Sequence, residues 1–133
     1  MNVKRMLLAA LAVFVSLQIM DFVVHQVLLS AEYEAAMELW RPDMMEMMWL
    51  NYVAGVILCL FFTYVFAKGY EGKGIMEGLR YGIVFAVGYH LVHILSQYFV
   101  YPIPWSLMMK WLLFGTIEFI ILGVVVSLIY KSK

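Results

Sequence analysis

The chain has 133 residues, 65% of them hydrophobic, and a mean hydropathy of +0.90. Nine basic and nine acidic residues give a formal net charge of zero. This composition excludes a soluble globular domain, because too little polar sequence remains to cover a core. We therefore expect one integral membrane domain covering residues 1–133, surrounded by the lipid bilayer and without a nucleic-acid partner.

Four apolar stretches are long enough to cross a bilayer as helices, which takes about 20 residues each. They cover residues 6–29, 47–67, 75–99 and 104–130. The first stretch resembles a signal peptide, but it is too long, contains Asp21 and lacks a small-x-small cleavage site, so we expect it to stay as a helix. The predicted fold class is all-α: a transmembrane four-helix bundle running up-down-up-down.

Charged residues divide between the two ends of these spans. One end carries bases: Lys4, Arg5, Lys68, Lys73, Lys131 and Lys133. The other end carries mainly acids, with Arg41 the exception: Glu32, Glu34, Glu38, Asp43 and Glu46. Because cytoplasmic loops of membrane proteins are rich in lysine and arginine, this pattern predicts that both termini and the 68–74 loop are cytoplasmic.

The segment between the first two stretches has its own helical pattern. Tyr33, Met37 and Trp40 recur at helical spacing before Pro42. This spacing predicts a short amphipathic helix lying on the outer membrane surface and stopped by the proline. Trp40 is also expected to belong to an outer aromatic belt, together with Trp49, Tyr52, Tyr101 and Trp105.

Two of the four apolar stretches carry a polar stripe. The stripe of the first stretch is Gln18, Asp21 and His25, and that of the third is His90, His93 and Gln97. Each set is spaced i, i+3, i+7, which places its members on one face of an α-helix. An acid in hydrocarbon costs about 3 kcal/mol, so such groups normally face a bundle interior and often mark a functional site.

The two stripes are expected to converge in the outer half of the bundle. The first and third helices run in the same direction, and the helical rise places Asp21 and His90 roughly 12 to 13 Å below the outer boundary. Asn51 on the second helix is expected at a similar depth, as is Glu118 on the fourth, with Lys110 nearer the surface. These residues together form the predicted polar site.

Three interpretations of this site stay open. In the first it is a structural network, with Asp21 paired to Lys110 or a histidine and hydrogen bonds fixing helix register. In the second it binds a transition metal or haem through His25, His90, His93 and Asp21. In the third it belongs to a proton or solute path, which would be blind because the inner half offers few polar groups.

The remaining sequence features favour a protein that is not an enzyme. No nucleophile elbow, phosphate loop or zinc-protease motif is present. Cys59 is the only cysteine, so no intramolecular disulfide forms, and a lone cysteine in an apolar helix is usually inert packing. The four methionines of segment 44–48 offer thioethers to Cu(I), but methionines at the head of a membrane helix are ordinarily apolar filling.

Glycines four residues apart predict a close helix contact. Gly74, Gly78 and Gly82 begin the third span. Small residues at this spacing let a neighbouring helix approach closely, and close approach is how helices associate in lipid. The glycine face serves either this bundle itself, a homo-oligomer or a larger membrane complex.

Three segments give the chain a recognisable pattern. They are residues 39–44 (LWRPDM), residues 66–74 (FAKGYEGKG) followed by Glu77 and Arg80, and residues 101–107 (YPIPWSL) followed by Lys110, Trp111 and Glu118. The pattern resembles a family of small four-span bacterial membrane proteins that has no assigned activity. The resemblance covers nearly the whole chain and implies a multi-pass protein of the bacterial inner membrane, but it brings no functional residues.

From the residues themselves, the function expected first is non-enzymatic. The protein would be an accessory subunit or a binder of a small ligand at the polar site in the outer half of the bundle. Metal or haem binding is the alternative, and proton or solute transport is the second alternative.

Overall fold

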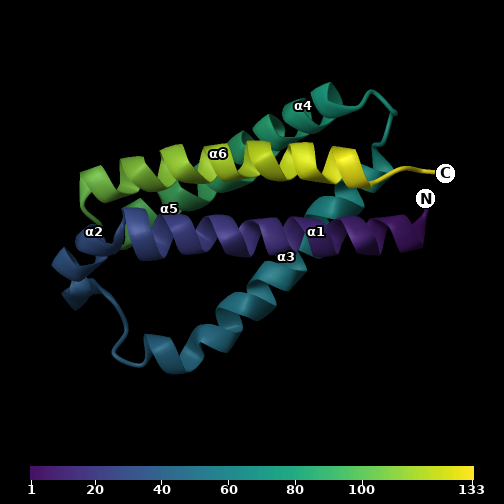
Figure 1. Ribbon diagram of the computed structural model, residues 1–133. Coiled ribbons are helices and arrows are strands. Elements are labelled where there is room, and N and C mark those ends of the chain that lie inside the picture. Colours follow the sequence, from purple (N-terminus) through teal and green to yellow (C-terminus); the bar gives the residue numbers. More distant parts are fainter.

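The computed structural model describes all 133 residues, and its regular elements are all helices. Four spans are long and apolar enough to cross a membrane: Val3–Leu28, Met44–Lys68, Ile75–Val100 and Trp105–Ile129. They alternate in direction, so both termini lie at one end of the molecule and the short helix α2 (Ser30–Ala35) lies at the other (Figure 1). We call these the terminal end and the α2 end. The predicted all-α, four-helix architecture is confirmed.

Two of the spans are not uniformly α-helical. In the first, α1 (Val3–Asp21) continues as a π-helical turn, Phe22–Leu28. In the third, a π-helical segment, Ala86–Leu91, separates α4 (Ile75–Phe85) from α5 (Val92–Val100). The other two spans contain the regular helices α3 (Met48–Lys68) and α6 (Trp105–Ile129). Two 3₁₀ turns connect α2 to α3: Met37–Leu39 and Met44–Met47.

Helices α4 and α6 pack with their backbones in direct contact. A Cβ atom added to Gly78 would lie 2.2 Å from the carbonyl oxygen of Gly123, and one added to Gly82 would lie 2.5 Å from that of Phe119. Only residues without side chains allow this approach. Gly74, the third predicted packing residue, lies outside the contact. It precedes α4 with a φ of +71° and has no atom within 4 Å of an added Cβ.

Aromatic side chains fill the terminal half of the bundle. Phe62 on α3 packs against Tyr81 on α4 with ring centroids 4.7 Å apart, and the Tyr81 hydroxyl donates a hydrogen bond to the Phe62 carbonyl. Tyr130, which is fully buried after α6, packs edge-on against Phe66. These contacts join α3, α4 and the C-terminal end of α6 in one core.

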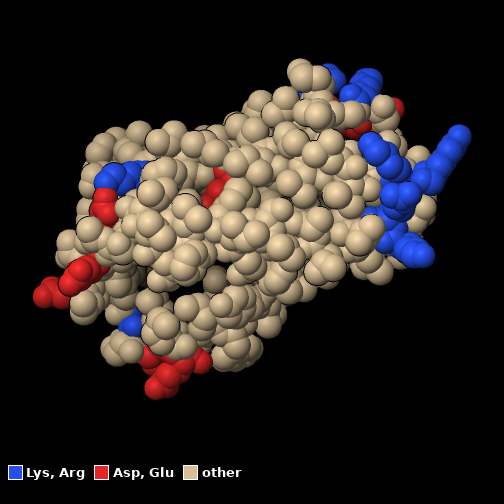
Figure 2. All heavy atoms as spheres, in the orientation of Figure 1, with Lys and Arg blue, Asp and Glu red and all other residues tan.

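Helix α3 packs closely only near the terminal end. Its buried residues begin at Cys59, whereas Trp49 and Tyr52 in its first half are 60% and 49% exposed. In Figure 1, α3 leans away from α1 and α6 toward the α2 end, and Figure 2 shows a hollow between it and the rest of the molecule. The bundle is therefore closed at the terminal end and opened by α3 at the α2 end.

Candidate functional site

A cavity of about 340 Å³ lies in the half of the bundle where α3 diverges. All four spans and α2 contribute to its walls. Six of the residues that line it belong to the predicted polar site: His25, Asn51, His90, His93, Gln97 and Glu118. The structure thus brings members of both polar stripes to one cavity.

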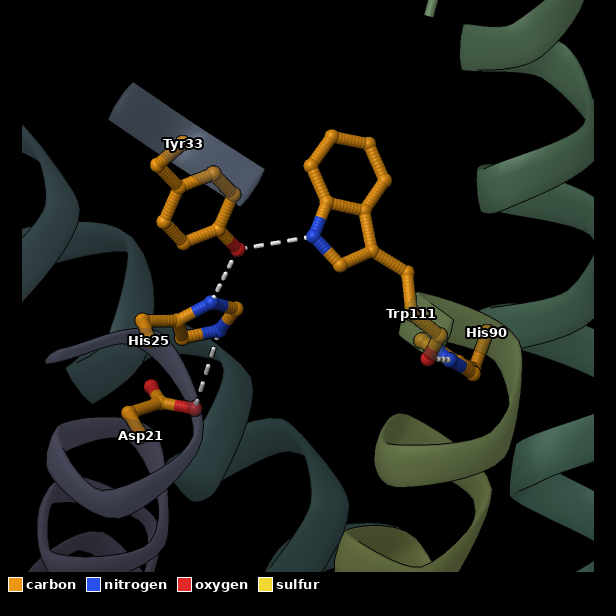
Figure 3. Close-up of polar contacts among 5 residues, drawn as sticks. All are labelled: Asp21, His25, Tyr33, His90 and Trp111. Atoms are coloured by element: carbon orange, nitrogen blue, oxygen red, sulfur yellow. Dashed lines mark hydrogen bonds and ion pairs between the residues drawn. The ribbon is translucent and has the colours of Figure 1, made fainter. Parts of the chain in front are cut away.

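On one side of the cavity, His25 connects the first span to α2 (Figure 3). Trp111 Nε1 donates a 2.7 Å hydrogen bond to the Tyr33 hydroxyl, and a short hydrogen bond joins that hydroxyl to Nδ1 of His25. The direction of this second bond depends on the tautomer of His25, because the Tyr33 oxygen can accept two hydrogen bonds as well as donate one. The other ring nitrogen of His25, Nε2, lies 3.8 Å from the Asp21 carboxylate.

Tyr33 keeps its hydrogen throughout the physiological pH range. Burial raises the pKa of its hydroxyl to about 12, although the hydrogen bond from Trp111 acts in the opposite direction. The hydroxyl is therefore protonated at any pH below 10, the ordinary pKa of tyrosine. Because the folded protein holds this proton more tightly than the unfolded chain does, ionisation of Tyr33 destabilises the fold only as the pH rises from 10 toward 12.

Two acids lie next to each other beside His25. The side chain of Asp21 approaches that of Glu118, which comes from α6 and lines the cavity. Oε1 of Glu118 is inaccessible to solvent and has no hydrogen-bond partner. No lysine or arginine pairs with either carboxyl group, and His25 is the only base in contact with Asp21.

On the other side of the cavity, His90 occupies a slot that a glycine provides. Its Nε2 donates a 2.9 Å hydrogen bond to the Trp111 carbonyl, and an added Cβ on Gly115 would lie 2.0 Å from the same nitrogen. Since a carbonyl only accepts, the proton of neutral His90 lies on Nε2 and Nδ1 carries a lone pair. Figure 3 shows Trp111 between the two histidines, with its indole bound to Tyr33 and its carbonyl to His90.

The third wall of the cavity is open. His93 bonds to the Gln97 side chain one turn further along α5 and stacks on Tyr89, with the rings 2° from parallel. His93 is exposed, and so is Asn51, the one lining residue from α3. The cavity is therefore open on the side between Asn51 of α3 and His93 of α5.

Three predicted members of the polar site do not line the cavity: Gln18, Asp21 and Lys110. Gln18 packs against Gly55 of α3 and does not line the cavity. Lys110 pairs with Glu32 on α2, so it does not neutralise Asp21, which instead faces His25. The pairing of Lys110 follows from α2, which carries Glu32.

The side chains as placed do not form the predicted metal site of His25, His90, His93 and Asp21. No three His, Cys, Asp or Glu side chains lie close enough together to hold one ion. Each histidine has a different partner: the Tyr33 hydroxyl for His25, the Trp111 carbonyl for His90 and the Gln97 amide for His93.

Sequence reasoning missed Tyr33 and Trp111 as site residues. Tyr33 and Trp40 were expected on the membrane surface, but both pack against Trp111, and Trp40 Nε1 donates to the Tyr33 carbonyl. Met37, the third residue of that pattern, is 64% exposed and α2 ends before it. One signal was available, because Trp111, Gly115 and Glu118 are spaced i, i+4, i+7 on one helix face.

No family model, curated protein or solved structure matches this chain. The cavity itself is therefore the basis for assigning a function.

Proposed function

We propose that this is a non-enzymatic membrane protein that binds a small molecule in the cavity beside α3. The observation that carries the proposal is that polar side chains from all four spans line a single cavity. Polar groups are costly within a membrane, and a purely structural network would satisfy them with one another. Here Glu118 Oε1 has no partner, while Asn51 and His93 are exposed at the open side.

The size and lining of the cavity support a ligand site. Small-molecule sites usually have volumes of about 300 to 1,000 Å³ and combine apolar walls with a few polar groups. This cavity falls in that range, and Val24, Ile94 and Phe114 supply its apolar surface. In addition, His25 and His90 both lie on π-helical segments, which occur frequently at functional sites.

Retention of a bound molecule tests this proposal. We expect native mass spectrometry of protein extracted in a mild detergent to show an added small-molecule mass on the wild type. Asn51→Trp, which places a bulky ring at the cavity mouth, is expected to remove that mass. Tyr52→Trp is the matched control, because Tyr52 is exposed on the same helix and does not line the cavity. The proposal is wrong if the wild type carries no extra mass, or if Asn51→Trp retains it fully.

We further propose that the α2 end faces outward and the terminal end faces the cytoplasm of a bacterial inner membrane. Figure 2 supports this orientation, since the lysines and arginines gather at the terminal end and the α2 end is mainly acidic. Cysteines at Glu34 and Ser132, one at each end, provide the test. We expect an impermeant maleimide to label Glu34→Cys in intact cells and to label Ser132→Cys only after permeabilisation. The reverse pattern would invert the topology.

A further inference from the structure

We infer that the molecule bound in this cavity is an amphipathic organic cation, in which an amine or quaternary ammonium group is attached to an apolar body. The positive charge would lie beside Glu118. This inference rests on the proposed function, because it names the chemical class of ligand that the same cavity takes.

The first argument is the charge of the cavity. Glu118 is the only acid in its lining, Asp21 lies against that carboxyl group, and no lysine or arginine lines the cavity. Two carboxyl groups side by side in a medium of low dielectric constant repel each other when both are charged. A proton or an external cation relieves this repulsion.

No resident side chain supplies a permanent positive charge to the pair. The titratable groups around it are His25 on the first span, Tyr33 on α2, Cys59 on α3, and His90 and His93 on the third span. The two bases at the α2 end have other partners, since Lys110 pairs with Glu32 and Arg41 with Asp43. A cationic ligand therefore meets no competing side-chain cation.

The second argument is the aromatic lining. Tyr33, Trp111 and Phe114 all line the cavity that contains Glu118. Aromatic faces attract cations within about 6 Å, and this attraction is used widely to bind alkylated ammonium groups. The open side between α3 and α5 leaves room for an apolar body that extends along the spans.

The third argument is the charge of the surface near the cavity. Glu34, Glu38 and Glu46 at the α2 end are exposed and form no ion pair. Figure 2 shows acidic side chains gathered there. A surface of one sign raises the local concentration of oppositely charged solutes, so cations are enriched at the end of the molecule that holds the cavity.

Three probes of the same size and different charge test the inference. They are benzyltrimethylammonium, its uncharged carbon analogue neopentylbenzene, and the anion phenylmethanesulfonate. Binding is measured by tryptophan fluorescence in phosphatidylcholine nanodiscs, whose zwitterionic surface does not itself concentrate cations. Each affinity is expressed relative to the mole fraction of probe in the lipid, so that partition into the bilayer is not counted as binding. We expect the ammonium to bind at least tenfold more tightly than either other probe. Equal or tighter binding of the neutral or anionic probe would overturn the inference.

Variants then assign the charge preference to Glu118. Glu118→Gln is expected to weaken ammonium binding at least tenfold and to leave the neutral probe unaffected. Asp21→Asn should act in the same direction, which keeps the test valid if one variant does not fold. Glu34→Gln, at an exposed acid outside the cavity, is the control and should change the affinity less than twofold. Unchanged ammonium affinity in both folded variants of the acid pair would overturn the inference.

Protonation gives a second readout. Because protons and the ammonium compete for the same pair of carboxyl groups, lowering the pH should weaken ammonium binding to the wild type and affect Glu118→Gln much less. The outcomes also separate the two proposals. If the neutral probe binds at least as tightly as the ammonium and Asn51→Trp excludes it, the ligand site is supported and its charge preference is refuted. If no probe binds and no mass is retained, both proposals fail.

Discussion

Replacing Gly78 by alanine is expected to destabilise the bundle by about 3 kcal/mol, the upper part of the usual range for overpacking. The new Cβ would lie 2.2 Å from the Gly123 carbonyl oxygen and 2.5 Å from Ser127 Oγ. The nearer of these atoms belongs to a helix backbone, so relief requires α4 and α6 to move apart. Thermal unfolding of the purified protein, followed by far-UV circular dichroism, measures the loss.

Gly88 provides the control for this substitution. It lies in the same span, and an added Cβ would have no neighbour within 4 Å. Gly88→Ala is expected to leave stability unchanged or raise it by up to about 1 kcal/mol, because alanine favours a helix over glycine. If Gly78→Ala is as stable as Gly88→Ala, the close contact of α4 with α6 does not exist.

Replacing Gly115 by alanine is expected to abolish ligand retention while leaving the fold intact. The added Cβ would lie 2.0 Å from His90 Nε2 and 2.1 Å from its Cε1. These atoms belong to a side-chain ring that can rotate away, unlike the backbone at Gly78. His90 would then lose its bond to the Trp111 carbonyl. We expect loss of the bound mass in native mass spectrometry, with at least tenfold weaker binding and an unchanged circular dichroism spectrum.

Gly55→Ala is the appropriate comparison for Gly115→Ala. Its Cβ would lie 3.4 Å from a Phe14 ring carbon and 3.5 Å from Gln18 Nε2, which are ordinary contacts. It should therefore retain the ligand. A Gly115→Ala protein that binds as the wild type does would show that the position of His90 is irrelevant to the site.

The four spans were predictable because a membrane helix is determined by the length of one apolar run, which is a local property. The contact at Gly78 and Gly82 was also local in its signal, since only small residues permit such an approach. The helix that these glycines contact was not predictable. Gly123 is distant in the sequence, and nothing around it indicates that it packs against Gly78.

The arrangement inside the site was less accessible to sequence reasoning. A period of 3.6 residues places Gln18, Asp21 and His25 on one face, but the span becomes π-helical after Asp21. Gln18 and His25 consequently face different neighbours. A π-helical turn leaves the apolar pattern of a span unchanged, so hydropathy alone does not reveal it.

The position of α2 also could not be predicted from local sequence patterns. Tyr33 and Trp40 suit either a membrane surface or the end of a bundle, because both environments accept a ring with one polar atom. In this protein they lie at the end of the bundle, because the rings of Tyr33 and Trp40 both pack against the indole of Trp111. The ion pair of Lys110 with Glu32 joins residues 78 positions apart and has no signal in either segment.

The divergence of α3 would determine the phase from which the proposed ligand is drawn. A cavity open to lipid between α3 and α5 would be filled from the bilayer, so the relevant concentration would be the mole fraction of ligand in lipid. Each methylene added to a ligand favours partition into lipid by about 0.8 kcal/mol. Its apparent aqueous affinity would thus rise about fourfold without one new contact to the protein. In a homologous series of alkyl ammonium ions, the dependence of apparent affinity on chain length would therefore measure partition into the membrane and not contacts with the protein.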